Sequence, residues 1–343
     1  MSASPTVSVI LPVWNAASTV ARAIASVRTQ TWTEWELIAV DDGSTDASGE
    51  IVEAAAREDR RVRRLARPHE GIVAALNAGL AEARGEFVAR MDADDEMYPE
   101  RLDAQVAFLR RAEHADIGLV GCQVEFGGDR AANAGYALHV DWINSLVTPA
   151  AIALNRFVES PLAHPSVMFR RELVERFGGY RAGDFPEDYE LWLRWMDAGV
   201  RMAKVPRVLL RWNDSAGRAS RVEARYAEEA FYRLKAEWIA RELKRVGGGR
   251  AVWVWGAGRP TRKRARELER WSVRIAGFVD VDAKKWTRAL GGVGVPVIGP
   301  EKLPRPEDVF VLGYVSSRGA REFIRAALRA RGFAEGRDFL MGA

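Results

Sequence analysis

The chain has 343 residues, of which 48% are hydrophobic and 29% charged, a composition typical of a globular protein with two or three domains. Lys and Arg total 51 and Asp and Glu total 47, so the formal net charge of +4 is too small to indicate a nucleic-acid-binding protein. The single cysteine excludes an intrachain disulfide and a cysteine-based metal cluster, and no apolar stretch approaches the ~20 residues that span a bilayer, so we expect a cytoplasmic protein.

The first ninety residues repeat a pattern of apolar strand, polar loop and helix. Strands are predicted at 6–11, 35–40, 62–65 and 85–91, and helical segments at 20–27, 51–57 and 72–83. This alternation predicts a mainly parallel α/β sheet. Ligands of such sheets bind beyond the carboxyl ends of the strands, where the sequence places Asp41-Asp42 and Asp92-Ala93-Asp94-Asp95.

The pattern becomes less regular further along the chain. We expect helices at about 99–111, 188–198 and 221–246, and strands at 117–126 and 167–170. Gly247-Gly248-Gly249 ends the last of these helices and is the best candidate for a domain boundary. The predicted domains are a first α/β domain over residues 1–220, a helical connector over 221–249 and a second α/β domain over 250–343.

Three carboxylates lie within four residues at Asp92, Asp94 and Asp95. They repel one another unless a cation is present, and Mg²⁺ or Mn²⁺ prefers oxygen ligands that it shares with a substrate diphosphate. The alternative is that these acids only cap the helix that follows. For the triplet alone, the two interpretations are equally favoured.

Several motifs in order resemble the family 2 glycosyltransferases, and the resemblance covers about residues 5–221. They are Pro12-Val13-Trp14-Asn15, Asp41-Asp42-Gly43-Ser44, Gly71 with Asn77-Ala78-Gly79, the Asp92 triplet, His164-Pro165-Ser166, Gly178-Gly179-Tyr180 and Glu187-Asp188-Tyr189. Each motif alone is weak, but their order and spacing are specific. One departure is Leu76, where many members of the family have an arginine that contacts the donor.

The resemblance implies a GT-A nucleotide-sugar-binding fold and inverting transfer of a sugar from a nucleotide diphosphate sugar to an acceptor hydroxyl. Asp188, with Glu187 beside it, would be the catalytic base, and Asp92 and Asp94 would hold the divalent metal, Mn or Mg. The nucleotide-sugar site would comprise Pro12, Val13, Asn15, Asp41, Asp42, Asn77, Asp92, Ala93 and Asp94.

Other residues are assigned to the site with less specific signals. His164 is expected to line the acceptor pocket, the alternative being a buried core histidine. Arg211, Trp212 and Arg218 are expected in a loop over the diphosphate, which Arg can bind with two parallel hydrogen bonds. The alternative for this loop is a basic helix cap. Core packing, rather than sugar stacking, is expected of Trp32, Trp35, Trp192 and Trp195.

The C-terminal segment begins a second strand-turn-helix pattern. Gly256-Ala257-Gly258 follows a predicted strand at 251–255, further strands are expected at 274–279 and 309–315, and a helix at 319–331. This predicts a Rossmann-like domain, although Thr261 replaces the third glycine of the dinucleotide fingerprint. The net charge is −6 over residues 1–244 and +10 over 245–343. A scaffold is favoured over an NAD-type site, and an anion site stays open.

The sequence therefore predicts a metal-dependent glycosyltransferase whose partners are a nucleotide-sugar donor and a glycan or glycolipid acceptor, with a role in polysaccharide biosynthesis. One alternative is a non-catalytic nucleotide-sugar sensor. The other is a sugar-phosphate nucleotidyltransferase, but such an enzyme would usually show a Gly-rich basic loop after the first strand, and Pro12-Val13-Trp14-Asn15 is neither Gly-rich nor basic. A peripheral contact with the inner membrane face through residues 221–246 stays open, and packing between the domains explains that apolar stripe more simply.

Overall fold

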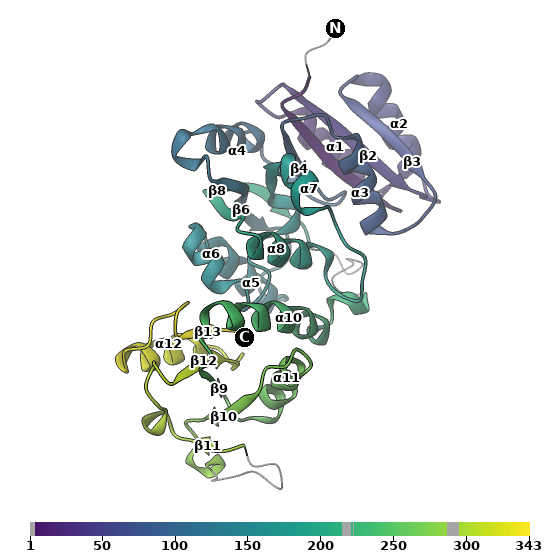
Figure 1. Ribbon diagram of the computed structural model, residues 1–343. Coiled ribbons are helices and arrows are strands. Elements are labelled where there is room, and N and C mark those ends of the chain that lie inside the picture. The colour runs from purple at the N-terminus through teal and green to yellow at the C-terminus, as the bar shows by residue number, and fades with distance from the viewer. Residues whose placement is uncertain (1–3, 215–220, 222, 287–294) are drawn as a thin grey trace. The chain divides into compact units, whose positions relative to one another are not determined.

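The computed structural model describes residues 4–214, 221, 223–286 and 295–343, and the chain divides into two compact units (Figure 1). The first unit comprises Met1–Ile152, Pro161–Gly183 and Glu187–Val222. The second comprises Ala153–Ser160, Asp184–Pro186 and Glu223–Ala343. Among the residues that the structure describes, every helix is too short or too polar to cross a membrane.

The first unit is built on an eight-stranded sheet with the strand order β3-β2-β1-β4-β7-β6-β8-β5. The strands are β1 (Val7–Val13), β2 (Trp35–Asp42), β3 (Val62–Arg67), β4 (Phe87–Arg90), β5 (Glu96–Met97), β6 (Ile117–Phe126), β7 (Met168–Arg170) and β8 (Arg201–Trp212). The helices along this part of the chain are α1 (Val20–Arg28), α2 (Ser48–Glu58), α3 (Ile72–Glu82), α4 (Arg101–Arg110), α5 (Ala134–Ser145), α6 (Pro149–Asn155), α7 (Glu172–Phe177) and α8 (Glu187–Asp197).

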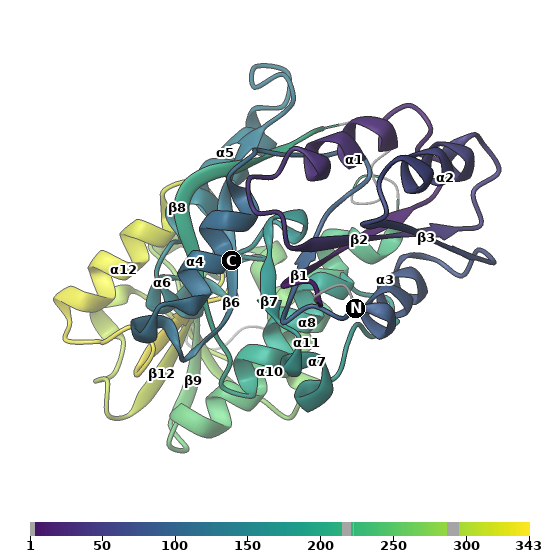
Figure 2. The same ribbon diagram turned by 90° about the horizontal axis from the view of Figure 1, so that it is seen from above.

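Side-chain alternation along β1 explains the layered arrangement of this unit. Val7, Val9 and Leu11 point into a core cluster with α1 and α2, whereas Ile10 points into a second cluster with α3. Figure 2 shows α1 and α2 on one side of β1–β3 and α3 on the other. A strand covered on both faces is mostly apolar, and all seven residues of β1 are buried. Its one polar side chain, Ser8, donates to Glu36 Oε1 at 2.7 Å.

The predicted mainly parallel α/β class is confirmed. Strands β3, β2, β1 and β4 are parallel neighbours, and β7 enters antiparallel between β4 and β6. The core prediction is also confirmed for three tryptophans: Trp35, Trp192 and Trp195 are all at most 2% exposed. Trp32 is partly buried and packs against the first core cluster.

Two predicted elements were wrong. Arg211 and Trp212 do not lie in a loop, because they end the twelve-residue strand β8, which pairs with β6. Pro206 and the register shifts of that pairing interrupt the apolar pattern, so the sequence does not reveal the strand. Helix α10 (Glu228–Val246) begins seven residues later than the predicted start at Arg221, after a 3₁₀ turn at Ala224–Tyr226.

The second unit contains a five-stranded parallel sheet with the order β11-β10-β9-β12-β13. Its strands are β9 (Ala251–Trp255), β10 (Ile275–Val279), β11 (Val297–Ile298), β12 (Val309–Gly313) and β13 (Phe339–Met341), and its helices are α10, α11 (Arg259–Glu269) and α12 (Ala320–Ala330). Gly256, after β9, has φ +110°, and a Cβ there would lie 2.6 Å from Val315. This turn therefore requires glycine.

Candidate active site at the carboxyl ends of the strands

The carboxyl ends of β1, β2 and β4 meet at one edge of the first sheet. Val13 of β1 is in register with Asp41 of β2, and the amide of Met91, just after β4, donates to the Ile10 carbonyl at 3.1 Å. The loops that follow these three strands are therefore neighbours. Pro12 and Val13 are buried within β1 itself.

Asn15 joins the loop after β1 to the loop after β2. Its backbone φ is +48°, a left-handed conformation that asparagine tolerates better than most residues. The Asn15 side-chain oxygen accepts a hydrogen bond from the Thr45 amide at 2.9 Å, and the Asn15 amide donates to Ser44 Oγ at 3.1 Å. The two loops thus form one connected rim of the site.

Asp41 is a buried carboxylate at the end of β2. It accepts hydrogen bonds from Arg64 Nη2 at 2.6 Å and from the Ser44 amide at 3.0 Å. Burial alone would raise the pKa of Asp41, but the hydrogen bonds from Arg64 and Ser44 outweigh it and lower the pKa below its ordinary value. The carboxylate is therefore ionised and held in place.

Asp42, the next residue, holds the loop that leads into α3. Its carboxylate accepts from the amides of Glu70 and Gly71 at 3.1 and 2.9 Å and lies 2.8 Å from His69 Nδ1. The His69 ring stacks on the exposed indole of Trp14, with 4.5 Å between ring centroids. Asp42 thereby fixes an aromatic surface beside the rim.

The carboxylates of Asp92, Asp94 and Asp95 follow β4, and their ligand atoms lie within 4.8 Å of one another. Asp95 is fully buried and accepts from the Asn213 amide at 2.8 Å, whereas Asp92 and Asp94 are half-buried, as is Ala93 between them. Oxygen ligands at this spacing fit Mg²⁺ or Mn²⁺, which commonly keep water or substrate oxygens in their remaining positions. Asp92 and Asp94 are the more accessible pair for a cation.

A buried arginine lies behind this cluster. Arg90, the last residue of β4, is 2% exposed and contacts Asp92 Oδ1 through Nη2 at 2.6 Å. Its other terminal nitrogen donates to the Met91 carbonyl. The guanidinium neutralises part of the negative charge that Asp92 brings to the cluster and fixes the orientation of that carboxylate.

Asp188 lies in the first turn of α8, half-buried, with its carboxylate accepting the Tyr189 amide at 2.7 Å. Burial and the negative charge of Glu187 raise the pKa of Asp188 to about 7, opposed by the Tyr189 amide and by Arg90. The charge of Asp92 also contributes to raising this pKa. The structure therefore brings Asp188 and the acidic cluster into one electrostatic environment, and such perturbed carboxylates are typical of active sites.

Asn77 and His164 both contact Tyr180. The Asn77 side chain donates to the Tyr180 carbonyl at 2.9 Å and accepts from its amide at 3.0 Å. His164 Nε2 lies 2.8 Å from the Tyr180 hydroxyl, and the imidazole is buried. Burial and the nearby charge of Arg90 lower the pKa of His164 well below its ordinary value, so the ring is neutral. Contacts of Asn77 with the donor and of His164 with the acceptor stay predictions.

The end of β8 places its residues next to the acidic cluster. The side-chain amide of Asn213, which follows Trp212, donates to the Asp94 carbonyl at 2.8 Å, and Arg211 pairs in register with Glu96 of β5. Trp212 is buried, whereas Arg211 is exposed. Arg218 lies outside the described residues.

Two residues around the site, Arg90 and Asn213, are not singled out by any sequence motif, and Tyr180 is singled out only as part of the Gly178-Gly179-Tyr180 motif, without a role of its own. Arg90 could have been found from the sequence, because it is a charged residue in the otherwise apolar strand Phe87–Arg90. A charge in a buried strand requires a partner, and the Asp92 carboxylate two residues later supplies it. Nothing local distinguishes Asn213, because its contacts join segments more than one hundred residues apart.

The chain is similar to known proteins over most of its length. The sequence profile of "Glycosyl transferase family 2" matches residues 8–178. "Putative glycosyltransferase EpsE" of Bacillus subtilis (strain 168) is 34% identical over 208 residues, 59% of this chain and 70% of that protein. An "Uncharacterized glycosyltransferase" of Haemophilus influenzae is 26% identical over 72% of this chain and 77% of its own.

A solved structure shares the fold. S. aureus TarS 1-349, crystallised in complex with UDP-GlcNAc, superimposes with a TM-score of 0.52 at 19% identity. The match covers 78% of this chain and 71% of that one. Together with the mixed sheet of the first unit, this likeness supports the predicted GT-A fold.

Proposed function

The chain belongs to glycosyl transferase family 2 and is a glycosyltransferase, and we propose that it moves a sugar from a nucleotide diphosphate sugar to an acceptor hydroxyl with inversion at the anomeric carbon. The observation that carries the proposal is the pairing of the Asp92 cluster with the raised pKa of Asp188. The carboxylates of the Asp92 cluster are suited to bind a divalent cation, and the Asp188 carboxylate is suited to act as a base.

The donor end of the reaction is assigned to Asp92 and Asp94. A divalent cation bound there would act as a Lewis acid that neutralises the charge of the departing diphosphate. Arg90 holds Asp92 in a fixed orientation from behind, through the 2.6 Å contact. The rim formed by Asn15, Asp41 and Asp42 is proposed to receive the nucleoside, with the exposed Trp14 indole beside it.

The acceptor end is assigned to Asp188. In a single displacement the acceptor hydroxyl loses its proton as it attacks the face of the anomeric carbon opposite the leaving group, so one carboxylate must lie on that face. A pKa of about 7 makes Asp188 a stronger base than an ordinary carboxylate while it is still ionised in a substantial fraction of molecules at neutral pH. A glycan or glycolipid hydroxyl is the proposed acceptor.

The test measures nucleoside diphosphate release from a panel of nucleotide sugars with Mn²⁺, with and without candidate acceptors. We expect Asp188→Asn to lower acceptor-dependent release by about 10²- to 10⁴-fold while donor binding is retained. Asp197→Asn, at the exposed far end of the same helix, is the matched control and should keep full activity. Equal release from both variants would remove Asp188 as the base.

The same assay separates transfer from binding alone. A sensor would bind a nucleotide sugar but never release nucleoside diphosphate above the Asp188→Asn level. Addition of EDTA should abolish release, and full activity in EDTA would contradict the assignment of a metal to Asp92 and Asp94.

A further inference from the structure

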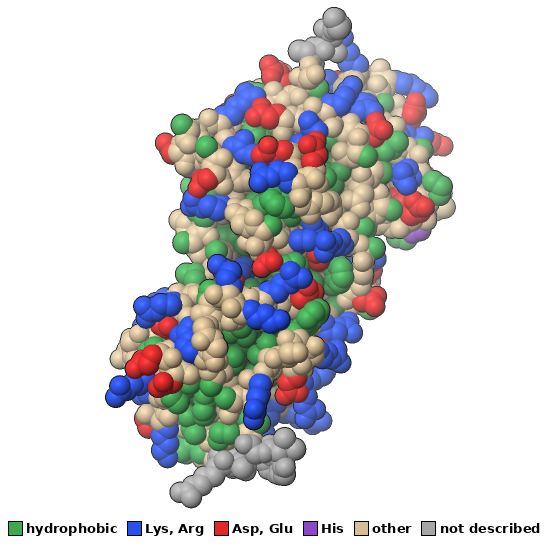
Figure 3. Space-filling view, viewed as in Figure 1, with side chains coloured by type: hydrophobic (Ala, Val, Ile, Leu, Met, Phe, Trp, Pro, Cys, Tyr) green, Lys and Arg blue, Asp and Glu red, His purple; other side chains and the backbone are tan. Residues whose placement is uncertain are grey.

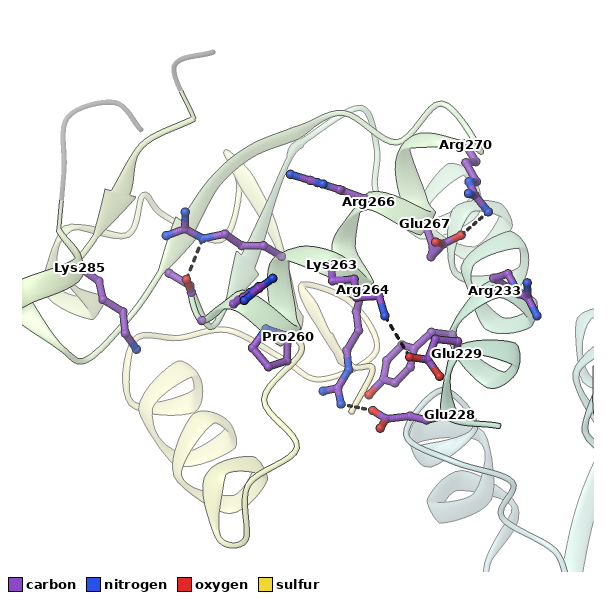
Figure 4. A pocket seen from close by; sticks show the side chains of 15 residues that line it. Glu228, Glu229, Arg233, Pro260, Lys263, Arg264, Arg266, Glu267, Arg270 and Lys285 are labelled. Atoms are coloured by element: carbon purple, nitrogen blue, oxygen red, sulfur yellow. Dashed lines mark hydrogen bonds and ion pairs between the residues drawn. The ribbon is translucent and has the colours of Figure 1, made fainter. Parts of the chain in front are cut away.

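The second unit contains an open pocket of about 1230 Å³ that lies between α10 and α11 (Figure 4). Every lining residue belongs to this unit, so the pocket shares no residue with the site of the proposed transfer. Eight of the lining residues are Arg or Lys, and only three are Glu. The pocket therefore has an excess of five positive charges.

Helix α11 supplies most of these cations from one face. Arg259, Lys263 and Arg266, with Arg270 directly after the helix, recur at spacings of three and four residues, which is the period of one helix face. Thr261, Ala265 and Leu268, on the opposite side, are buried against the unit. In Figure 3, Lys and Arg side chains gather along the edge of the second unit where Figure 1 draws α11.

Part of this charge is neutralised within the unit. Lys263 pairs with Glu229 at 3.0 Å, and Arg270 pairs with Glu267 at 2.7 Å. Arg264 contacts Glu228 and lies over the Tyr232 ring.

Arg259 and Arg266 are different. Both are exposed, and neither forms an ion pair with another residue that the structure describes. Like charges held on one helix face repel one another, so an anion in the pocket would stabilise this arrangement.

We propose that this pocket binds a small phosphate-bearing ligand, either a free organic phosphate or a phospholipid head group. Arginine matches phosphate because its planar fork donates two parallel hydrogen bonds. The pocket, at about 1230 Å³, is somewhat larger than the ~300–1,000 Å³ of most small-molecule sites and so has room for a phosphate with an organic group. Tyr232, Ala257 and Pro260 add apolar surface for the organic part.

The geometry of Asp280 argues against a dinucleotide of the NAD type at this turn. In such sites an acidic residue at the end of the second strand binds the ribose hydroxyl. Here the Asp280 carboxylate accepts from the Ala257 amide at 2.8 Å and pairs with Lys285 at 3.0 Å. Asp280 therefore holds the glycine-rich turn, and Lys285, which also lines the pocket, neutralises the carboxylate that would bind a ribose hydroxyl.

The test uses the full chain with the substitutions Asp92→Asn and Asp94→Asn, in a buffer that contains EDTA. Under these conditions the proposed donor site should not contribute to phosphate binding. Inorganic pyrophosphate is titrated by isothermal titration calorimetry. In a second arm, the protein is sedimented with phosphatidylcholine vesicles with or without phosphatidylglycerol. We expect saturable binding in at least one arm, and the arm that responds identifies the source of the phosphate.

The decisive comparison is between two double variants of equal charge change. Arg259→Glu with Arg266→Glu should weaken binding by more than about tenfold, because two charge-assisted hydrogen bonds are replaced by repulsion. Arg274→Glu with Arg305→Glu changes two exposed arginines elsewhere in the unit and should weaken it by less than about threefold, through screened long-range charge alone.

Circular dichroism and the unfolding midpoint check that both double variants fold. Absence of saturable binding in both arms, or equal weakening by the two double variants, would overturn the proposal. Sugar transfer measured with Asp92 and Asp94 intact is independent of this result, so a failure here is distinguishable from failure of the proposed function.

Discussion

Replacement of Arg90 by methionine tests whether the buried guanidinium organises the acidic cluster. The side chain of Arg90 is 2% exposed and that of Asp92 is 25% exposed, with 2.6 Å between their charged atoms. Removing one partner of a buried pair typically costs about 3–5 kcal/mol of unfolding free energy. Because Asp92 is partly solvated, we expect a loss near the lower end, about 3 kcal/mol.

The same substitution changes the acid-base behaviour of the site. Arg90 lowers the pKa of Asp188, so its removal should raise that pKa further. A base acts when ionised, so the acidic limb of the pH profile of kcat/KM should move to higher pH in Arg90→Met and move less in Arg90→Lys, which keeps the charge. A purely structural role for Arg90 would not produce this shift.

Urea denaturation and a pH-rate profile measured at constant Mn²⁺ provide both values. Arg110→Met is the control, because Arg110 forms an exposed pair with Glu86 at 2.8 Å that should contribute less than about 1 kcal/mol. If Arg90→Met is no less stable than Arg110→Met and its pH profile is unchanged, Arg90 does not organise the cluster.

Three other predictions concern single groups. The wild-type profile of kcat/KM should lose activity as pH falls through a value above the ordinary carboxylate pKa, since Asp188 must be ionised to accept a proton, and an unperturbed acidic limb would contradict its assignment. Asn77→Ala should lower the unfolding free energy by about 1–3 kcal/mol, because the Tyr180 amide and carbonyl lose their partners, and urea denaturation that shows no loss would exclude this connection. Burial lowers the pKa of Lys235 and of Lys204 to about 7 in the folded chain, below their pKa in the unfolded chain. Between about pH 7 and 9 the unfolded chain therefore binds more protons than the folded chain, and the unfolding free energy should rise with pH. In Lys235→Met this rise should be smaller, and an unchanged slope by denaturation at several pH values would disprove the contribution of Lys235.

Local sequence patterns predicted correctly those elements whose structure is determined by residues close by in the sequence. The strand predicted at 117–126 coincides with β6, because its apolar run is bounded on both sides by polar turns. The acidic residues at 41–42 and 92–95 lie together at one sheet edge, because parallel strands place their carboxyl ends side by side.

Long-range pairing explains what the sequence did not reveal. Strand β8 contains Lys204, which is buried and donates to the Pro161 carbonyl at 2.8 Å, and this charge together with Pro206 conceals the strand pattern. The partners of Lys204 are the Ile143 and Pro161 carbonyls, both more than forty residues away, and no local pattern indicates them. The role of Arg90 likewise depends on its burial, a property of the folded sheet.

The position of Asp188 relative to the acidic cluster depends on contacts among α3, α8 and the segment before α8. The segment Phe177–Tyr180 leads from α7 toward α8, and Arg194 of α8 donates to its Gly178 and Gly179 carbonyls at 3.2 and 2.6 Å. Asn77 of α3 binds Tyr180 in the same segment.

This connection fixes α8 against the parallel half of the sheet, so Asp188 is held by packed helices. Precise placement of a base contributes to rate by orientation, which a shift of about 1 Å can lower by 10²-fold. Changes at Arg194 should therefore lower kcat more than they raise the KM for the donor, because the ligands proposed for the donor's diphosphate and nucleoside follow β1, β2 and β4.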